Sequence, residues 1–316
     1  MPAVVELDRP RTAVGREVLE LAAGGPVAGD FGDLADAAVA ALVQEATLTP
    51  KPGLVDLRGG GAHPDMDVDL MIASAHALRP SFARMAVRVD GAPDGPPDLG
   101  AVRTRLAAIG RDAERDMFAV TGGVNTHRGA IWALGLTIGA LASLASEPGP
   151  ADAGTVLRRV AAIAAQADAR PDLSTPPTTG ARTRARYRVP GAVGAAQAGF
   201  PQALTAFAAL RRRPASGAGR THVQLDALLG SMTTLDDTCL LSRGGPSGLA
   251  LARAGARQVL ALGGSATAAG SIALARLDAT LTSTRLSPGG SADMLALALL
   301  LDATTAPPTR SLRKDS

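Results

Sequence analysis

The chain has 316 residues, of which 46% are hydrophobic and 2% aromatic, so it can bury a large core built from aliphatic side chains. Its net charge is only +3. Because no basic block is interleaved with aromatic residues, this charge argues against a nucleic-acid partner. A single cysteine, Cys239, excludes an internal disulfide and a multi-cysteine zinc site, and it favours a cytoplasmic location.

The composition predicts an all-α fold, because alanine and leucine favour helices and no run alternates between apolar and polar residues. We expect a single large multi-helix domain over 33–302, a weakly ordered segment over 1–32 and a disordered tail over 303–316. The longest apolar run, 130–145, is too short to span a membrane and predicts a buried core helix. We expect neither a signal peptide nor a membrane partner.

Helices are predicted wherever apolar residues recur at a spacing of three or four. A short helix over 15–23 is plausible, and Asp33 can cap the first regular one, which ends before the TPKPG turn. The stretch 170–190 is rich in Pro, Thr and Arg, and it is predicted to be irregular, as a lid or ligand loop. The predicted helices cover 33–46, 66–89 (kinked or broken at Pro80), 99–117, 126–146, 151–169, 201–213, 223–235, 247–262, 267–283 and 287–302.

Lys51 lies between two prolines in TPKPG and is one of only two lysines, the other being Lys314. A chain that uses arginine almost everywhere else and keeps a lysine here indicates a position that requires a compact ammonium group. Such a group usually meets a phosphate, a carboxylate or a reacting atom. The alternative is an ordinary surface lysine in a loop.

Four glycine-bearing polar segments each precede a predicted helix: GGGAHPDMD (59–67), TGGVNTHRGA (121–130), SRGGPSG (242–248) and SPGGSAD (287–293). Glycine allows close approach of the backbone to a ligand, and free amides at a helix start bind anions. Together the segments predict a phosphate cradle made of glycine-rich ligand loops at helix N-termini. Taken singly, each segment is also typical of an ordinary boundary between helices.

Side chains within these segments have predicted local roles. Asn125 or Thr126 can cap the helix that follows, with His127 and Arg128 in its first turn. Ser287 is a natural N-cap, with Pro288 at the first helical position. The chain contains neither a P-loop nor a G-x-G-x-x-G fingerprint, so P-loop and Rossmann nucleotide binding are excluded.

The motifs EATLTPKPGLVD, AHPDMD, LRPSF, TGGVNTHRGAIWALG, GFP, DDTCLLSRGG and SPGGSADMLA follow one another in the chain. In this order they resemble the triphosphoribosyl-dephospho-coenzyme A synthases over about 33–302, which would make this region the catalytic domain. The resemblance implies an all-helical fold and a reaction of ATP with 3′-dephospho-coenzyme A. In that reaction the 2′-hydroxyl of the acceptor attacks C1 of the ATP ribose, adenine leaves and the triphosphate stays on the sugar.

The resemblance also implies partners downstream. The product would pass to a phosphoribosyl-dephospho-coenzyme A transferase, which loads it onto an acyl-carrier subunit of malonate decarboxylase or citrate lyase. The amino-acid sequence around DDTCLL is more similar to the malonate decarboxylase branch of the family. A homodimer is possible.

Two polyanions held near one carbon require several cations and amides or a metal ion. Arg58 and the run Arg182, Arg184, Arg186 and Arg188 are candidates for a mobile basic clamp, although the run is also typical of a solvated loop. The residues predicted to bind ATP and the acceptor are Lys51, Arg58, Gly122, Gly123, Asn125, Thr126, Arg128, Arg243, Gly244, Gly245, Ser287, Gly289, Gly290 and Ser291.

For the chemistry, Asp65 and Asp67 lie two residues apart and are predicted to bind Mg²⁺ and to act in catalysis. Their alternative role is to match the dipole of a helix start. His127, or His63, is predicted to protonate the departing adenine. The sequence does not identify the base. Further candidate carboxylates are Asp56, Asp236, Asp237 and Asp293.

Three positions depart from the family pattern. Val193 and Ala195 stand where an Arg and a Glu are expected, and Ser242 stands where His is common. Loss of the expected Arg and Glu is neutral if these two residues only pair with each other; otherwise it alters substrate binding. Two other functions stay open: a Mg²⁺-dependent ADP-ribosyl or nucleoside hydrolase, and a non-catalytic nucleotide-binding helical protein.

Overall fold

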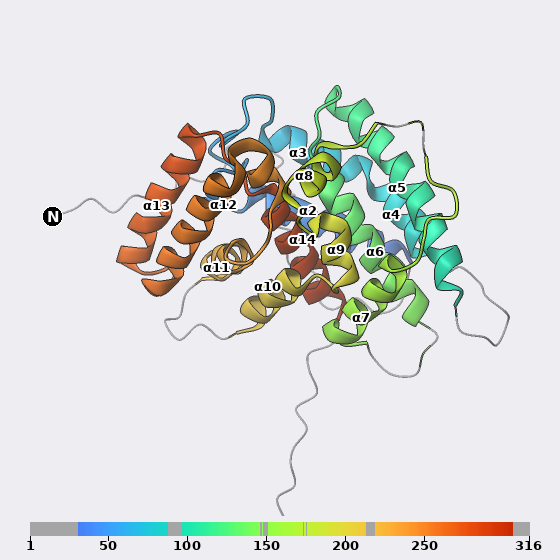
Figure 1. The fold of residues 1–316 in the computed structure, drawn as a ribbon. Helices are drawn as coiled ribbons and strands as arrows, with labels where there is room; N and C mark the ends of the chain where they lie inside the picture. Colours follow the sequence, from blue (N-terminus) through green and yellow to red (C-terminus); the bar gives the residue numbers. More distant parts are fainter. Residues whose placement is uncertain are drawn as a thin grey trace, which may run out of the picture.

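A computed structural model describes residues 31–87, 97–145, 147, 151–172, 174, 176–212 and 219–305. The predicted N-terminal segment 1–32 therefore lies outside the described residues, apart from residues 31 and 32. The same holds for the short helix predicted over 15–23 and for the tail beyond 305. Among the described residues every regular element is a helix, which confirms the all-α prediction (Figure 1). The helices are α2 (Phe31–Thr47), α3 (Val68–Ala77), α4 (Arg79–Ala86), α5 (Leu99–Thr121), α6 (Arg128–Leu144), α7 (Ala153–Ala164), α8 (Thr179–Tyr187), α9 (Gly191–Gln197), α10 (Pro201–Arg211), α11 (Arg220–Met232), α12 (Thr238–Ala261), α13 (Ala268–Ser283) and α14 (Gly289–Thr304).

Helix α14 forms the centre of the molecule and packs against α2, α6, α10, α11 and α12 (Figure 1). Its side chains from 294 to 301 are all buried. Helix α6 is likewise buried over most of its length, as predicted for the apolar run 130–145. A helix that is apolar on all sides is stable only when other helices surround it, and these two occupy that position.

Proline and glycine set several helix ends as predicted. The segment 66–89 is broken at Leu78, so that α3 ends at Ala77 and Pro80 lies in the first turn of α4. Proline is tolerated there because the first amides of a helix have no intrahelical acceptor. Helix α2 ends at Thr47, just before the TPKPG turn.

The prediction for 170–190 was wrong in its second half, which forms α8, and α9 was not predicted. Thr178 caps α8 by accepting a hydrogen bond from the Ala181 amide, and alanine and arginine then favour the helix. The segment 242–248 precedes a helical stretch, as predicted, but it also follows one that was not predicted. Helix α12 begins at Thr238 and is kinked at Gly245, which has non-helical angles (φ 59°, ψ −161°).

None of the helices in the described ranges is long and apolar enough to cross a membrane.

Candidate functional site

The four glycine-bearing segments lie close to one another, and Arg243 connects three of them. Its Nη1 lies 3.3 Å from the carbonyl oxygen of Ala62 and 3.2 Å from that of Arg285, just before α14. Its Nη2 lies 3.0 Å from Nδ1 of His63. Arg243 therefore joins α12, the loop before α3 and the loop before α14.

The fourth segment joins the group through the start of α6. A methyl group added at Gly129 would come within 1.9 Å of Oδ2 of Asp293, so the Asp293 carboxyl lies against the first turn of α6. Figure 1 shows α6 and α14 beginning near the top of the view, where α3, α8 and the upper turns of α12 also lie. The predicted convergence of the segments is therefore present.

The start of α14 is closed by a buried carboxylate and does not form an open cradle. Oδ2 of Asp237 accepts hydrogen bonds from the backbone amide (3.0 Å) and hydroxyl (3.1 Å) of Ser291. Its Oδ1 accepts from the amides of Cys239 (2.9 Å) and Leu240 (3.4 Å) at the start of α12. A methyl group at Gly290 would lie 3.1 Å from this carboxyl. The phosphate contacts predicted for Gly290 and Ser291 do not fit, because Asp237 occupies this place.

Two further predictions at α14 need correction. Gly289 packs against Cys239, since a methyl group there would lie 3.1 Å from its Sγ. Ser287 is not the N-cap; Pro288 holds that position, without a side-chain cap bond. The Ser287 hydroxyl is instead buried and has no hydrogen-bond partner among the described residues.

The glycines after α5 end that helix. Gly122 (φ 62°) and Gly123 (φ 92°) adopt positive φ, and the amides of both donate to the carbonyl of Phe118. This is an ordinary αL helix end, so neither amide is free for a phosphate. At the start of α6 the N-cap is His127, not Asn125 or Thr126 as predicted, so His127 lies just before the first turn. Oδ1 of Asn125 still accepts from the Arg128 amide (3.2 Å), and Oγ1 of Thr126 lies 2.6 Å from Oγ of Ser74.

Gly244 and Gly245 form the kink in α12. Gly245 requires the positive φ, and a methyl group at Gly244 would lie 2.5 Å from the Leu286 side chain. On the outer side of the kink, Ser242 and Arg243 are exposed to solvent. The glycines therefore shape the surface from which Arg243 projects.

Lys51 does not reach a ligand surface. Its side chain is 1% exposed, and Nζ donates to Oε1 and to the backbone carbonyl of Glu45, both at 2.6 Å. The requirement for a compact ammonium was predicted correctly, but the partner is a carboxylate at the end of α2 and not a phosphate. A buried charge requires such a partner.

Two other predicted phosphate ligands are already neutralised. Arg58 pairs with Asp56 (2.7 Å) and Asp278 (2.8 Å), and Arg128 pairs with Glu114 (2.8 Å). Arg243, in contrast, contacts only neutral groups in the described part of the chain. Arg243 is therefore the predicted cation best suited to receive an anion.

His127 is buried and neutral. Its side chain is 3% exposed, Nδ1 lies 2.9 Å from Oγ of Ser74, and Nε2 has no partner in the described residues. Burial, and then the nearby charge of Lys51, lower its pKa to about 3. At neutral pH it holds no readily donated proton, so the predicted acid role does not fit. A neutral ring nitrogen without a partner can still accept a hydrogen bond.

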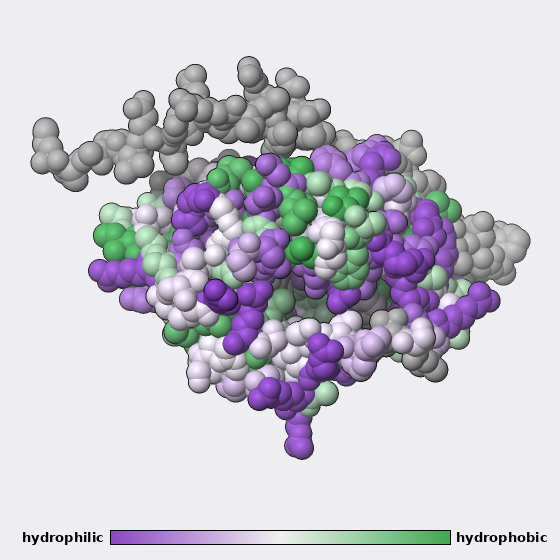
Figure 2. Space-filling view, turned by 90° about the horizontal axis from the view of Figure 1, so that it is seen from above, coloured by the Kyte–Doolittle hydropathy of each residue, from purple (hydrophilic) through white to green (hydrophobic). Residues whose placement is uncertain are grey.

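Asp65 and Asp67 border an open hollow of about 530 Å³, within the size range of pockets for small molecules. Asp65 is 56% exposed and lies 3.8 Å from Nδ1 of His63, whereas Oδ1 of Asp67 caps α3 by accepting from the Leu70 amide (2.8 Å). Figure 2 looks down on this end of the molecule and shows hydrophilic side chains mixed with apolar ones. The residues that line the hollow are Pro64, Asp65, Met66, Asp67, Asp69, Leu70 and Ala73.

Asp69 was not predicted as a site residue, although the alternation DMDVD places a third acid two residues after Asp67. Within the described ranges no group of three or more His, Cys, Asp or Glu side chains is arranged to hold a metal ion. A cation in the hollow would therefore need ligands from water or from substrate. This suits Mg²⁺, which usually binds one or two protein carboxylates.

Beneath this surface lies a second group of acids. Burial, and then the negative charges of Asp237 and Glu45, raise the pKa of Asp293 well above its ordinary value. Burial also raises the pKa of Asp237 and that of the Cys239 thiol. These groups lie at the starts of α12 and α14.

His63 lies between the hollow and α12. Burial and the charge of Arg243 lower its pKa, while the nearby Asp65 opposes the shift. Like His127, it is a poor acid at neutral pH. Its contacts with Arg243 and Asp65 instead link the basic and acidic parts of the site.

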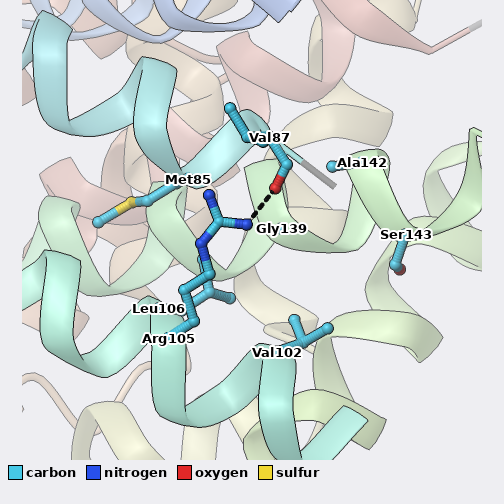
Figure 3. Close-up of a pocket in the computed structure, with 8 residues that line it drawn as sticks. All are labelled: Met85, Val87, Val102, Arg105, Leu106, Gly139, Ala142 and Ser143. Atoms are coloured by element: carbon cyan, nitrogen blue, oxygen red, sulfur yellow. Dashed lines mark hydrogen bonds between the residues drawn. The ribbon is translucent and has the colours of Figure 1, made fainter. Parts of the chain in front are cut away.

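A separate hollow between α4, α5 and α6 is shown in Figure 3. It measures about 10 Å³, and its lining is largely apolar apart from Arg105, which donates to the Val87 carbonyl (2.6 Å). It is too small for a nucleotide and represents imperfect packing.

Comparison with known proteins decides the family. The model of the ATP:dephospho-CoA triphosphoribosyl transferase family matches residues 31–310. The chain belongs to this family.

Relatives in the family are similar over most of their length. The 2-(5''-triphosphoribosyl)-3'-dephosphocoenzyme-A synthase of Klebsiella pneumoniae is 47% identical over 275 residues, which cover 85% of this chain and 93% of the relative. A probable synthase of the same name from Stutzerimonas stutzeri is 50% identical, covering 86% and 91% of the two chains. No solved structure matches the chain. The resemblance stated from the motifs is confirmed, and the chain is a transferase.

Proposed function

We propose that this transferase moves the triphosphoribosyl group of ATP to the 2′-hydroxyl of 3′-dephospho-coenzyme A, with release of adenine. Family membership supports the class of reaction. The structural observation that carries the proposal is the contact of Arg243 with the loop before α3, next to an acidic hollow large enough for a nucleotide. One polyanion can bind there with a cation, and a second can approach from the side of α12.

The reaction breaks one bond and forms another. The bond between C1 of the ATP ribose and N9 of adenine breaks, and its electron pair leaves with adenine. The 2′-oxygen of the acceptor forms the new bond to C1, and the proton of the hydroxyl ends on adenine. Positive charge develops on the ribose as the glycosidic bond lengthens, and a nearby carboxylate stabilises that charge.

The hollow fits a bound Mg²⁺ ion. Asp65, Asp67 and Asp69 surround it with negative charge, so a triphosphate would be repelled unless a cation lay between them. Carboxylate oxygens are suitable ligands for Mg²⁺. In this proposal Asp65 and Asp67 would hold the ion, which would supply positive charge beside the triphosphate. Arg243 then supplies hydrogen bonds from the side of α12.

His127 is proposed as an acceptor and no longer as an acid. Its Nε2 is the free atom of a buried, neutral ring whose other nitrogen is fixed by Ser74. We assign to Nε2 the hydrogen bond from the incoming 2′-hydroxyl, formed when substrate displaces the side chains that cover the ring. Asp293 lies against the start of the same helix and holds a proton more firmly than an ordinary carboxyl.

The pathway is also part of the proposal. We infer that the product serves the prosthetic group of malonate decarboxylase, with citrate lyase as the other candidate. The amino-acid sequence around Asp236 and Cys239 supports this choice. A separate transferase would carry the product to an acyl-carrier subunit. Growth on malonate after deletion of the gene, compared with growth on citrate, distinguishes the two.

Asparagine variants of the two aspartates test the Mg²⁺ role. Asp65→Asn removes a charge that no helix cap needs, and Asp67→Asn removes charge while asparagine keeps the cap of α3. Both should slow adenine release by at least about tenfold and raise the Mg²⁺ concentration needed for half-maximal rate. Asp98→Asn, at the cap of α5, is the matched control. Parental rates in both site variants would contradict the assignment.

A further inference from the structure

Helix α8 carries an unusual concentration of positive charge. Its only buried residue is Thr183, which faces the interior, and the four arginines of the helix and its end are exposed. No ion pair joins any of them to a carboxylate among the described residues. These arginines are Arg182, Arg184, Arg186 and Arg188.

The sequence around α8 offers no local neutralisation, since no Asp or Glu occurs between Asp172 and Asp226. Some exposed arginines elsewhere do have a carboxylate partner. For example, Arg79 pairs with Asp36 (2.6 Å) and Arg84 pairs with Asp112 (2.7 Å). Like charges on neighbouring turns of a helix repel one another, so an external anion would stabilise α8.

The contacts of α8 place it beside the candidate site. Its beginning lies against the start of α12, because a methyl group at Gly180 would be 3.8 Å from Oγ1 of Thr238. Its end lies against the α12 kink, because a methyl group at Gly245 would be 3.5 Å from the hydroxyl of Tyr187. Between these points α12 carries Arg243, which contacts His63 beside the hollow.

The two sides of Arg243 therefore have opposite charge. On one side are Asp65, Asp67 and Asp69, which can accept a phosphate group only through a cation. On the other side is α8, where guanidinium groups can bind phosphate oxygens directly and in pairs. The proposed reaction needs two polyanionic substrates, and the molecule offers two phosphate environments of different kind.

We propose that the exposed arginines of α8, together with Arg243, bind the diphosphate of the acceptor substrate, 3′-dephospho-coenzyme A, while the acidic hollow receives the triphosphate of ATP with Mg²⁺. This assignment rests on the proposed function for the identity of the acceptor. It gives α8 the function of selecting the second substrate.

The test measures binding without turnover. Titration calorimetry with 3′-dephospho-coenzyme A, in the absence of ATP and Mg²⁺, compares the parent with Arg184→Gln/Arg188→Gln. The double variant should raise Kd by about tenfold or more, since it removes two charged donors from the diphosphate. The salt dependence of Kd should become shallower, and Kd for Mg–ATP should stay within about twofold of the parent.

The control is Arg212→Gln/Arg276→Gln, which removes two positive charges at exposed positions on α10 and α13. It should leave both dissociation constants unchanged, and thermal melting should show that both double variants are folded. Unchanged affinity for 3′-dephospho-coenzyme A in the α8 variant would overturn the assignment. Equal losses for both substrates, or for both double variants, would overturn it too, as would a parent that does not bind the acceptor.

These outcomes are separate from failure of the proposed function. If the parent binds 3′-dephospho-coenzyme A through α8 but transfers no triphosphoribosyl group to it, the proposed reaction is wrong and the binding site stands. If the parent makes the product and the α8 variant keeps its affinity for the acceptor, the reaction stands and this inference is wrong.

Discussion

Lys51 has one of the largest fully buried side chains among the described residues, and its Nζ pairs with the carboxylate of Glu45 (2.6 Å). Lys51→Met should lower the free energy of unfolding by about 3–5 kcal/mol, because Glu45 would be left buried without a counter-charge. Lys51→Met combined with Glu45→Met should lose less than Lys51→Met alone. Urea unfolding followed by circular dichroism measures both. A double variant that loses the sum of the two single effects would contradict the pairing.

The depressed pKa of His127 predicts a pH dependence of stability. The ring is neutral in the folded chain down to a pH of about 3, whereas the unfolded chain binds a proton below its ordinary pKa of about 6.5. The stability that His127 contributes is therefore present above pH 6.5 and is lost as the pH falls. Between pH 7 and pH 5 the parent should lose about 2 kcal/mol more than His127→Asn. Asparagine preserves a polar atom near Ser74. Parallel pH profiles in urea unfolding would contradict the prediction.

At the scale of single residues the sequence predicted which positions are special better than it predicted their partners. The environment of Lys51 was marked by the scarcity of lysine, but its partner Glu45 belongs to the preceding helix, and nothing in the spacing identifies it. Arg243 and Arg128 were both predicted to bind phosphate, and Arg58 was predicted to belong to a mobile basic clamp. Only the carboxylates that reach Arg58 and Arg128 from α13 and α5 separate the three.

The first turns of α12 and α14 share one hydrogen-bond acceptor, Asp237. Its side chain is 2% exposed and accepts backbone amide hydrogen bonds from both helices. Asp237→Ala should lower the free energy of unfolding by at least about 3 kcal/mol, because several buried donors lose their acceptor. Asp152→Ala is the matched control at the exposed start of α7, where losing a cap costs about 1 kcal/mol. Thermal or urea unfolding compares them. Equal losses would show that Asp237 is an ordinary cap.

The kink of α12 depends on glycine at 245. Gly245→Ala should lower the free energy of unfolding by about 1–3 kcal/mol, since a positive φ is strained for alanine. Gly110→Ala is the control in the interior of α5, where the nearest atom to an added methyl group is 4.0 Å away. That change should raise stability by about 0.5–1 kcal/mol through helix propensity. Urea unfolding of the two variants measures the contrast, and an alanine tolerated at 245 would contradict it.

At the scale of elements, apolar spacing and prolines predicted the long helices, and Pro80 predicted the break between α3 and α4. Glycine and proline at 242–248 predicted a helix boundary, and the structure has a kink at Gly245; the helical turns before it, from Thr238, were not predicted. Helix α8 was missed because the prolines before Thr178 outweighed the alanines and arginines after it.

Across the whole molecule, α14 holds the helices together and its start lies beneath the candidate site. The order of the motifs was enough to predict the family and the convergence of the segments. It could not predict that the Ser291 amide would bind Asp237, because hydrogen-bond partners distant in sequence depend on the fold. Nor could it separate an acidic hollow from a basic helix on either side of Arg243.

The division of charge has a consequence for the intact enzyme. With the triphosphate bound through a cation and the acceptor bound by arginine, removing Mg²⁺ with a chelator should abolish turnover but leave the affinity for 3′-dephospho-coenzyme A within about twofold. Calorimetry and an adenine assay in the presence of EDTA measure the two properties. Loss of acceptor binding in EDTA would contradict separate phosphate sites.

The most direct test of the reaction is mass spectrometry of the products formed from ATP and Mg²⁺, with and without 3′-dephospho-coenzyme A. With the acceptor present, we predict one free adenine for each acceptor that gains a triphosphoribosyl group, and no adenine when the acceptor is left out. Adenine release that proceeds equally well without the acceptor, leaving ribose triphosphate, would identify a hydrolase and contradict the account.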